Sequence, residues 1–483
     1  MLFPTFVFGA FFVVVFVVNW LTRPHPALWK PLMLAASIVF YGWWSWRFVF
    51  LLFATIVINW VVGHFAAARL WDSGQGVAGS AQAAKWWVRI GVTANLGILG
   101  VFKYWDFFAV EMSNLLESIG ISGALPVLEY TLPVGISFYT FQAMSYIIDI
   151  GRGNVREMAP LDFAVYLSFF PQLVAGPIVR AAEMAPQLAA RPDPRYVPAA
   201  EAFGLILNGL FKKVVISSFL ASEIVDGVFA DPGAHSGPEV VLGVYAYAVQ
   251  IYADFSGYTD IAIGVALLLG FRFPQNFNNP YRALTLQDFW RRWHMTLSRW
   301  LRDYLYVPLG GNRGGRVNTY RNLMIVMLLG GLWHGSTWNF VIWGGIHGVV
   351  LAVERLVREQ RERSGAGPLL SPGLGEVLRW LVTFHVVCLA WVFFRSESLS
   401  AAVEMLGAVA SFDNYAGTAT PLVIAVTFGA LAFQFMPTDW FDQLRDGFAS
   451  LGWVAQGAVV GVSLVAIDVL GPTGVAPFIY FQF

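Results

Sequence analysis

The 483-residue chain is 57% hydrophobic and only 12% charged, with 30 basic and 30 acidic side chains and a formal net charge of zero. Soluble domains carry about 25% charged residues, so this chain has too little polar surface for a water-soluble globule. A net charge of zero gives no reason to expect a nucleic-acid partner, and the lone cysteine, Cys388, excludes an internal disulfide and any multi-cysteine metal site.

The first apolar run, residues 6–18, has no Lys or Arg before it and no small-residue cleavage site after it. Both features argue against a cleaved signal peptide. Trp20 and Arg23 follow the run, as interfacial anchors do at the end of a membrane span. We therefore expect this run to be a first membrane-crossing helix.

Apolar segments recur along the chain, and a helix needs about 20 such residues to cross a bilayer. Three segments, 162–178, 322–336 and 338–353, are too short or too interrupted for a plain crossing. We therefore predict an all-α, polytopic membrane protein with about eleven transmembrane helices plus re-entrant and interfacial helices, in one domain over 1–483. The candidate spans are 3–20, 28–46, 48–68, 86–108, 132–150, 162–178, 200–221, 239–270, 322–336, 338–353, 376–394, 421–437 and 451–470.

The distribution of basic residues predicts the orientation in the lipid bilayer. Nine arginines lie in the stretch 272–321, whereas loops 109–131 and 223–239 contain no Lys or Arg. Since basic residues concentrate on cytoplasmic loops, we place the arginine-rich stretch inside and the N-terminus outside. Segments 71–84 and 364–375 are rich in small residues and are predicted to be flexible loops.

A polar cluster interrupts the apolar span 239–270. Asp254, Gly257 and Tyr258 fall on one helical face, and Gly257 would permit a close helix approach. Such groups either hold helices together or line a polar path, and both possibilities stay open. A second irregular point after this span contains Asn278 and Asn279.

The stretch 272–321 is the longest polar insertion, yet it has a helical pattern. Thr285 followed by Asp288 is typical of a capped helix start. So charged a helix cannot span, and we predict an interfacial helix on the cytoplasmic side, either a plain anchor or part of a site. One stripe contains Trp290, Trp293, Leu297, Trp300, Leu301, Tyr304 and Leu305, and the opposite side contains Arg291, Arg292, Arg299, Arg302 and Asp303.

Two histidines stand out. His294 falls within the apolar stripe, so its ring nitrogens must be satisfied, either as a bonded core histidine or as a chemical group of a site. His334 lies in a glycine-flanked polar segment, 330–340, between two short apolar segments whose outer ends meet basic residues. That pattern predicts a hairpin with His334 deep in the membrane, where it is either a general base or a helix–helix hydrogen-bonding group.

At these residues the sequence resembles the membrane-bound O-acyltransferase superfamily, in particular its bacterial alginate O-acetyltransferase branch. The resemblance covers about residues 130–350, in the order of the family. The matching segments are LPVGISFYTFQ (132–142), FFPQLVAGPIVR (169–180), YADFSGYTDIAIG (252–264), FNNPYRALTLQDFWRRWHMTLSRWLRDYLYVPLGGNR (277–313) and GLWHGSTWNF (331–340).

The resemblance implies that His334 is catalytic and that His294 contributes. It implies a ring of helices around a central tunnel, which joins a cytoplasmic acyl-donor site to an acceptor site on the opposite side. It also implies a multi-pass protein of the bacterial cytoplasmic (inner) membrane. Relatives work with separate extracytoplasmic acetyltransferases.

The expected reaction is transfer of acetyl from acetyl-CoA, as co-substrate, towards a polysaccharide outside the membrane, without a bound cofactor or metal. His334 would act as general base, with Ser336 or Asn339 near the oxyanion. Asp254, Tyr258, Asn278 and Asn279 are predicted to line the tunnel or to support the site. Arg291, Arg292, Arg299 and Arg302 could hold the CoA phosphates, although membrane orientation alone also explains arginines there.

The predicted outside loops are short and contain no Ser-His-Asp arrangement, and the chain has no GxSxG segment. We therefore expect a partner with its own serine nucleophile to complete transfer to the sugar. The same fold acting on peptidoglycan, cellulose or teichoic acid, the last by D-alanyl transfer, stays open. A transporter or channel is a remote alternative, because no second copy of the histidine segments is present.

Overall fold

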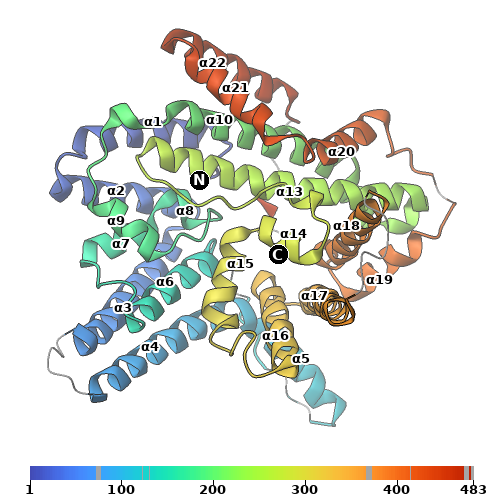
Figure 1. Cartoon of the computed structure of the whole chain (residues 1–483), viewed down its shortest axis with the longest axis horizontal. Helices are drawn as coiled ribbons and strands as arrows, with labels where there is room; N and C mark the ends of the chain where they lie inside the picture. Colours follow the sequence, from blue (N-terminus) through green and yellow to red (C-terminus); the bar gives the residue numbers. More distant parts are fainter. Residues whose placement is uncertain are drawn as a thin grey trace. The chain divides into compact units, whose positions relative to one another are not determined.

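The computed structural model describes residues 1–71, 78–121, 123, 125–129, 131–365, 373–413, 415–472 and 478–479. Across these ranges every regular element is helical (Figure 1), which confirms the all-α prediction. Half of the two predicted flexible loops, namely 72–77 and 366–372, lies outside the described residues. The loop prediction is wrong over 78–84, because α4 already begins at Ala78 in a segment whose alanines favour helix.

By length and composition, six helices in the described part of the chain could cross a membrane. Three shorter apolar helices, Phe6–Thr22, Leu399–Ala408 and Pro421–Phe433, accompany them. The six long helices are Trp46–Leu70, Ala199–Ala230, Gly237–Leu268, Trp338–Ser364, Leu374–Arg395 and Trp453–Leu470.

The chain divides into two compact units. The first consists of Met1–Ala202 and Ala262–Pro274, and the second of Phe203–Ile261 and Gln275–Phe483. That they act as one membrane domain stays a prediction. The helices of the first unit are α1 (Phe6–Thr22), α2 (Pro26–Gly42), α3 (Trp46–Trp71), α4 (Ala78–Leu99), the π-helix η1 (Gly100–Tyr104), α5 (Trp105–Ser118), α6 (Ile136–Gly151), α7 (Pro160–Ser168), α8 (Phe170–Leu173), α9 (Ala181–Ala189) and η2 (Pro194–Tyr196).

The first unit is built on tight contacts made by glycine. Gly135 has a left-handed backbone with φ of 75° and caps α6, and a Cβ there would lie 2.3 Å from the carbonyl oxygen of Leu173. Only glycine allows so close an approach. Gly135 and Leu173 belong to the segments 132–142 and 169–180, so these two segments meet at the start of α6. The break that Pro171 and Gly176 predict in 162–178 is confirmed by the short helices α7 and α8.

The second unit carries both of the predicted histidines. It includes most of α10 (Ala199–Leu210), from Phe203 on, and most of α13 (Gly237–Leu268), up to Ile261. Its other elements are η3 (Phe211–Ser217), α11 (Ser218–Leu220), η4 (Ala221–Val225), α12 (Asp226–Ala230), η5 (Pro232–Ala234), η6 (Pro280–Arg282), α14 (Leu286–Arg292), α15 (Met295–Leu301), η7 (Arg302–Tyr306), α16 (Arg316–His334), α17 (Trp338–Ser364), α18 (Leu374–Arg395), α19 (Leu399–Ala408), α20 (Pro421–Phe433), α21 (Thr438–Ser450) and α22 (Trp453–Leu470).

In the second unit, α10 lies against the middle of α13. A Cβ at Gly209 would lie 2.5 Å from the carbonyl oxygen of Gly257, and one at Gly257 would lie 2.7 Å from that of Gly209. The close approach predicted for Gly257 is thus confirmed, and its partner is a second glycine. Lys212, just beyond the contact, forms an ion pair of 2.5 Å with Asp260 of α13.

Candidate active site

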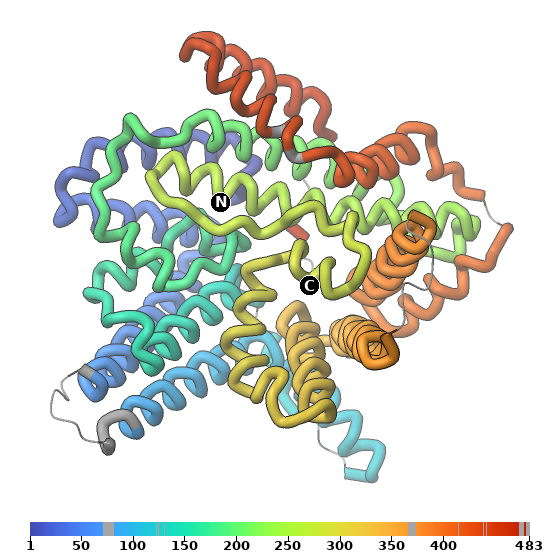
Figure 2. Tube along the Cα trace, in the orientation of Figure 1, coloured from blue at the N-terminus to red at the C-terminus, as the bar shows by residue number. Residues whose placement is uncertain are grey.

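His334 is the last residue of α16, where the chain turns back into α17. The two helices lie side by side (Figure 2). The reversal requires glycine at three positions. A Cβ at Gly331 would lie 2.2 Å from the carbonyl oxygen of Phe340, and one at Gly344 would lie 2.3 Å from that of Met327. A Cβ at Gly335 would lie 1.9 Å from the Phe340 ring. The glycine-flanked hairpin predicted from the sequence is therefore confirmed as a close contact of two helices, and it fixes the position of His334.

Aromatic rings surround His334, which is 5% exposed. The centroids of the Trp333, Trp343 and Phe394 rings lie 4.9, 5.0 and 5.2 Å from its own, each nearly perpendicular to it. An imidazole held in this way keeps its orientation through packing and lies in a low-dielectric environment. Such a setting strengthens any hydrogen bond that the ring makes with a substrate.

His294 lies where the predicted interfacial helix breaks. The amphipathic pattern predicts one helix from Trp290 to Leu305, and that prediction is wrong. α14 ends at Arg292, His294 adopts a left-handed backbone with φ of 41°, and α15 begins at Met295. This conformation is uncommon outside glycine, so surrounding contacts must stabilise it.

Asn276 provides those contacts. Its side-chain oxygen accepts hydrogen bonds from the backbone N–H of Thr296 at 3.2 Å and from the Thr296 hydroxyl at 2.9 Å. Its backbone carbonyl accepts from the N–H of Met295 at 2.9 Å. Since a backbone N–H can only donate, the amide orientation is fixed, with Oδ1 facing the break.

The same oxygen determines the tautomer of His294. Oδ1 of Asn276 lies 3.1 Å from Nδ1 of His294, so Nδ1 must carry the proton and Nε2 the lone pair. Burial of the fully enclosed ring lowers the pKa of His294 to about 3. His294 is therefore a neutral imidazole at physiological pH.

The structure brings the two histidines onto one indole ring, although forty residues separate them. The Trp333 ring lies 5.9 Å from the His294 ring and 4.9 Å from the His334 ring, centroid to centroid. Phe255 of α13 covers another side of His294 at 4.7 Å. The sequence marks 276–281 as an irregular stretch, but Asn278 and Asn279 were selected from it as site residues and the amide that holds His294 was not.

The remaining predicted polar residues lie elsewhere in the second unit. Asn278 is exposed, and its backbone N–H donates to the carbonyl of Arg292 at 2.9 Å. Asn279 has a left-handed backbone with φ of 46°. Ser336 is half-buried in the turn after His334, and Nδ2 of Asn339 donates to the carbonyl of Ser396 at 2.7 Å.

Asp254 links three parts of the chain. Its Oδ1 accepts from the ammonium group of Lys213 in η3 and from the Ser217 hydroxyl at 3.2 Å, and its Oδ2 accepts from the backbone N–H of Ile479 at 2.9 Å. Asp254 therefore holds elements together, the first of the two possibilities for this cluster. Lys213 was missed, although a lysine inside an apolar span is a signal that a buried carboxylate lies nearby.

Tyr258, on the same face of α13, is buried against a ring from far along the sequence. The Phe478 ring lies 4.7 Å from the Tyr258 ring and 5.7 Å from that of Phe255, centroid to centroid. Since Phe255 also covers His294, the segment at Phe478 and Ile479 reaches the surroundings of the site. No sequence pattern indicated this contact.

The four predicted phosphate-binding arginines differ in their surroundings. Arg291 is exposed, and Arg299 is half-buried. Arg292 donates to the Asp288 carboxylate at 2.9 Å, and Arg302 to that of Asp303 at 2.7 Å. Both pairs are solvent-accessible, so each contributes only about 0.2–1 kcal/mol and can be exchanged for a phosphate contact.

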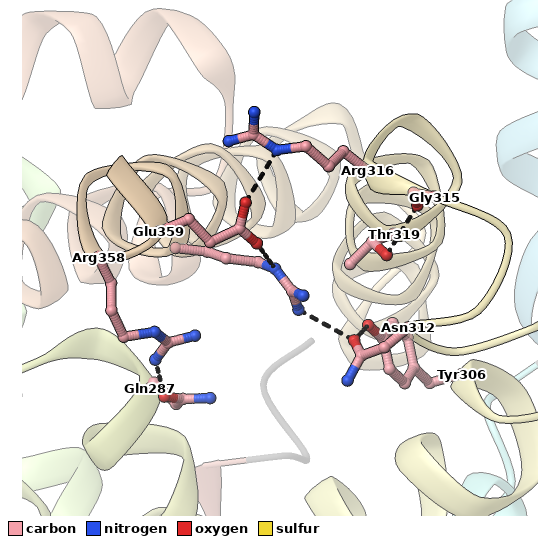
Figure 3. A network of polar contacts seen from close by, with 9 residues as sticks. Gln287, Tyr306, Asn312, Gly315, Arg316, Thr319, Arg358 and Glu359 are labelled. Atoms are coloured by element: carbon pink, nitrogen blue, oxygen red, sulfur yellow. Dashed lines mark hydrogen bonds and ion pairs between the residues drawn. The ribbon is translucent and has the colours of Figure 1, made fainter. Parts of the chain in front are cut away.

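A polar network joins the far ends of α16 and α17 to α14 (Figure 3). The Glu359 carboxylate accepts from Arg316 at 2.9 Å and from Arg355 at 2.7 Å, and Arg355 also donates to Asn312 at 2.9 Å. Arg358 donates to the side chain of Gln287 at 2.9 Å. The network therefore couples the hairpin that carries His334 to the helix that leads to His294.

Glu354 strengthens the same link. Its carboxylate accepts from the backbone N–H groups of Leu286 at 2.6 Å and Gln287 at 3.2 Å. A carboxylate from α17 thus caps the first turn of α14, beside the hydroxyl of Thr285, which accepts from the N–H of Asp288 at 3.0 Å. The capped start predicted from Thr285 is confirmed. Among the residues described, no group of three or more His, Cys, Asp or Glu side chains is arranged to hold a metal ion.

Comparison with known proteins agrees with this arrangement. The chain is 37% identical over 491 residues to the "Probable alginate O-acetylase AlgI" of Azotobacter vinelandii, covering 94% of each. It is 38% identical to the "Peptidoglycan O-acetyltransferase" of Helicobacter pylori, over 79% of this chain and 73% of that protein. Similarity to the "Teichoic acid D-alanyltransferase" of Bacillus subtilis is 27%, over 55% of this chain and 69% of that protein.

Residues 136–395 match the membrane-bound O-acyltransferase family, abbreviated MBOAT. That range includes α13, both histidines and the α16–α17 hairpin, which are the parts that build the site. With its apolar helices, this multi-pass membrane protein is an acyltransferase that belongs to the membrane-bound O-acyltransferase family.

Proposed function

We propose that the protein is an O-acetyltransferase of the bacterial inner membrane. It takes acetyl from acetyl-CoA on the cytoplasmic side and delivers it towards an extracytoplasmic polysaccharide, with His334 as general base. The observation that carries the proposal is the placement of His334, held by glycine contacts and aromatic rings in the hairpin of α16 and α17. The position of His294 against the same indole, that of Trp333, supports it.

The proposed chemistry needs no covalent enzyme intermediate. His334 takes the proton of the acceptor hydroxyl, and the oxygen attacks the carbonyl carbon of the thioester. The tetrahedral intermediate breaks its C–S bond, and the leaving thiolate takes the proton from His334, so protons and charge balance. His294, held by Asn276 and lying against the same indole as His334, would help to orient the acceptor.

Acetyl rather than D-alanyl transfer is favoured by the comparisons. Relatives named for alginate or peptidoglycan acetylation share 37–42% of residues over most of this chain. Relatives named for teichoic acid D-alanylation share 27–29% over 55–60% of it. Purified protein should therefore release thiol from acetyl-CoA, and turnover of a D-alanyl carrier-protein thioester instead would assign it to the other group.

The test of His334 is reconstitution in proteoliposomes with acetyl-CoA. His334→Ala should insert and fold normally yet lose thiol release and product acetylation. His385→Ala is the matched control, because His385 is exposed on α18 and bonds to the Tyr245 hydroxyl at 2.7 Å. Near wild-type turnover in His334→Ala would overturn the general-base assignment.

We also propose that Arg291 and Arg292 anchor the phosphates of CoA. Neutralising both to Gln should raise the KM for acetyl-CoA more than it lowers kcat, because phosphate anchoring acts equally in ground and transition states. Arg445→Gln on α21, which removes an exposed arginine paired with Asp442 at 3.0 Å, is the control. An unchanged KM would move the phosphate site elsewhere.

Transfer to the polymer is proposed to need a separate extracytoplasmic acetyltransferase with a serine nucleophile. The test is sealed vesicles with acetyl-CoA on the cytoplasmic side and polymer on the other. Addition of the serine enzyme should be required for polymer acetylation. Efficient acetylation by this chain alone would end the relay proposal and leave the acyltransferase assignment intact.

A further inference from the structure

Three nitrogen-bearing rings meet beside His334. Trp290 of α14, Trp343 of α17 and His347 of α17 contact one another pairwise, with ring centroids 5.7 Å apart for the two indoles. His347 lies 5.2 Å from Trp290 and 4.7 Å from Trp343. The Phe289 ring is stacked with that of His347 at 6.3 Å. Each of the three rings therefore contacts the other two, with centroids no more than 5.7 Å apart.

The ring nitrogens in this volume lack partners. Nε1 of Trp290, Nε1 of Trp343 and both nitrogens of His347 are shielded from solvent and have no hydrogen-bond partner among the described residues. His347 is fully buried, and Trp343 is 1% exposed. Buried donors are almost always satisfied in native proteins, and bilayer lipid offers no substitute acceptor.

Three other indoles of this chain have acceptors. Nε1 of Trp29 donates to Asn19 at 2.8 Å, that of Trp380 to the carbonyl of Tyr281 at 2.8 Å, and that of Trp391 to the Tyr281 hydroxyl at 3.1 Å. The cluster of Trp290, Trp343 and His347 differs from these three indoles. It lies next to the proposed base, because the Trp343 ring that contacts His347 also contacts His334 at 5.0 Å.

The cluster offers mainly hydrogen-bond donors. Two indole N–H groups and one N–H of a neutral imidazole offer three donors, and the second imidazole nitrogen offers one lone pair. A carbonyl oxygen accepts about two hydrogen bonds, whereas an oxyanion has room for a third. Three donors acting on one oxygen would therefore favour a developing oxyanion over the carbonyl from which it forms.

We propose that Trp290, Trp343 and His347 form a hydrogen-bonding site for one oxygen atom, the carbonyl oxygen of the acyl thioester, and stabilise it as an oxyanion during attack. This rests on the proposed acetyl transfer with His334 as base. Two sources can supply the oxygen, the thioester carbonyl or a permanently bound water, and the experiment separates them. Asn339, the residue that the sequence suggested for this role, already donates through Nδ2 to Ser396.

The test replaces each donor by a ring of similar shape without N–H. Trp290→Phe and His347→Phe should each lower kcat by about 100-fold to 1000-fold, the effect of removing one oxyanion donor, while KM for acetyl-CoA changes little. His347→Gln keeps a donor and should recover part of the loss. Trp380→Phe removes a half-buried indole N–H that already has an acceptor, so it is the matched control and should keep kcat.

A second measurement does not depend on turnover. In the His334→Ala background, the carbonyl stretch of bound acetyl-CoA labelled with ¹³C should shift to lower frequency, and the added Trp290→Phe or His347→Phe change should remove the shift. Unchanged kcat with a lower melting temperature would indicate a structural water only and overturn the proposal, as would an unshifted carbonyl. Absence of thiol release from the unmutated protein would instead refute the proposed function.

Discussion

His294 and His334 lie against the same indole but are held by different means. His294 is fixed by hydrogen bonds, since Asn276 sets its tautomer and stabilises the left-handed turn around it. His334 is fixed by packing, through glycine contacts between α16 and α17 and through aromatic rings. The proposed roles differ accordingly: His294, held by an amide, orients the substrate, and His334, held by packing, acts as the base.

The largest expected loss of kcat distinguishes these two roles directly. His334→Gln should lower kcat by about 10³-fold or more, and His294→Gln by about 10-fold to 100-fold, because only the first removes the base. Single-turnover thiol release with acetyl-CoA, at equal amounts of inserted protein, measures both. Equal losses would mean that the two histidines act as one unit.

The next largest effect is expected from a disruption of the packing that holds His334. Gly331→Ala places a methyl group 2.2 Å from the Phe340 carbonyl, so α16 and α17 must separate, with a loss of about 1–3 kcal/mol in stability and a lower kcat. Gly461→Ala on α22 is the control, since no atom lies within 4 Å of its added Cβ. Normal kcat and melting temperature in Gly331→Ala would show that the close contact does not position His334.

Loss of the hydrogen bonds that hold His294 should lower kcat less than Gly331→Ala does, and it should clearly lower the stability of the protein. Asn276→Leu leaves the Thr296 N–H and hydroxyl and Nδ1 of His294 without their acceptor, a loss of about 1–3 kcal/mol. Asn276→Asp keeps an acceptor and should keep the fold, but its negative charge favours the protonated imidazole of His294. The pH profile of kcat should then shift in the Asp variant, and an unshifted profile would contradict the contact.

The contrast between His294, held by hydrogen bonds, and His334, held by packing, also determines how much of this site the sequence predicts. The hairpin at His334 is readable because Gly331, Gly335 and Gly344 mark the close contact within one short segment. The break at His294 is not readable, because the spacing of Trp290, Trp293 and Leu297 fits an unbroken helix and no glycine marks the left-handed residue. Asn276 acts from eighteen residues away, and no periodicity encodes such a pairing.

The sequence predicts the fold class and the positions at which helices are interrupted. Apolar runs identify helices, and Pro171 with Gly176 identify a break. The same runs do not reveal which buried polar atoms find partners. Lys213 finds Asp254, whereas the nitrogens of Trp290, Trp343 and His347 find none among the described residues. That distinction depends on tertiary contacts, which is why the sequence does not predict the ring cluster.

The smallest expected effect is the contribution of His294 to the pH dependence of stability. Its pKa is lowered from 6.5 to about 3 by burial, so between these values the unfolded chain binds a proton that the folded protein does not. Stability therefore falls as the pH falls through this window, by about 1.4 kcal/mol per pH unit from this group. Melting temperatures from pH 7 to pH 5 should fall less steeply for His294→Gln than for the unmutated protein. His64→Gln, which changes an exposed histidine, is the control.

The three-way contact of Asp254 has a consequence for biogenesis. A single Lys or Asp at the centre of a helix opposes insertion by about 2.5–3.5 kcal/mol, and Lys213 and Asp254 lie in separate spans. Their ion pair offsets that cost only if the two spans leave the translocon together. The N–H of Ile479 is synthesised 225 residues after Asp254, so the last bond of this buried centre closes only once the C-terminal helices have been made.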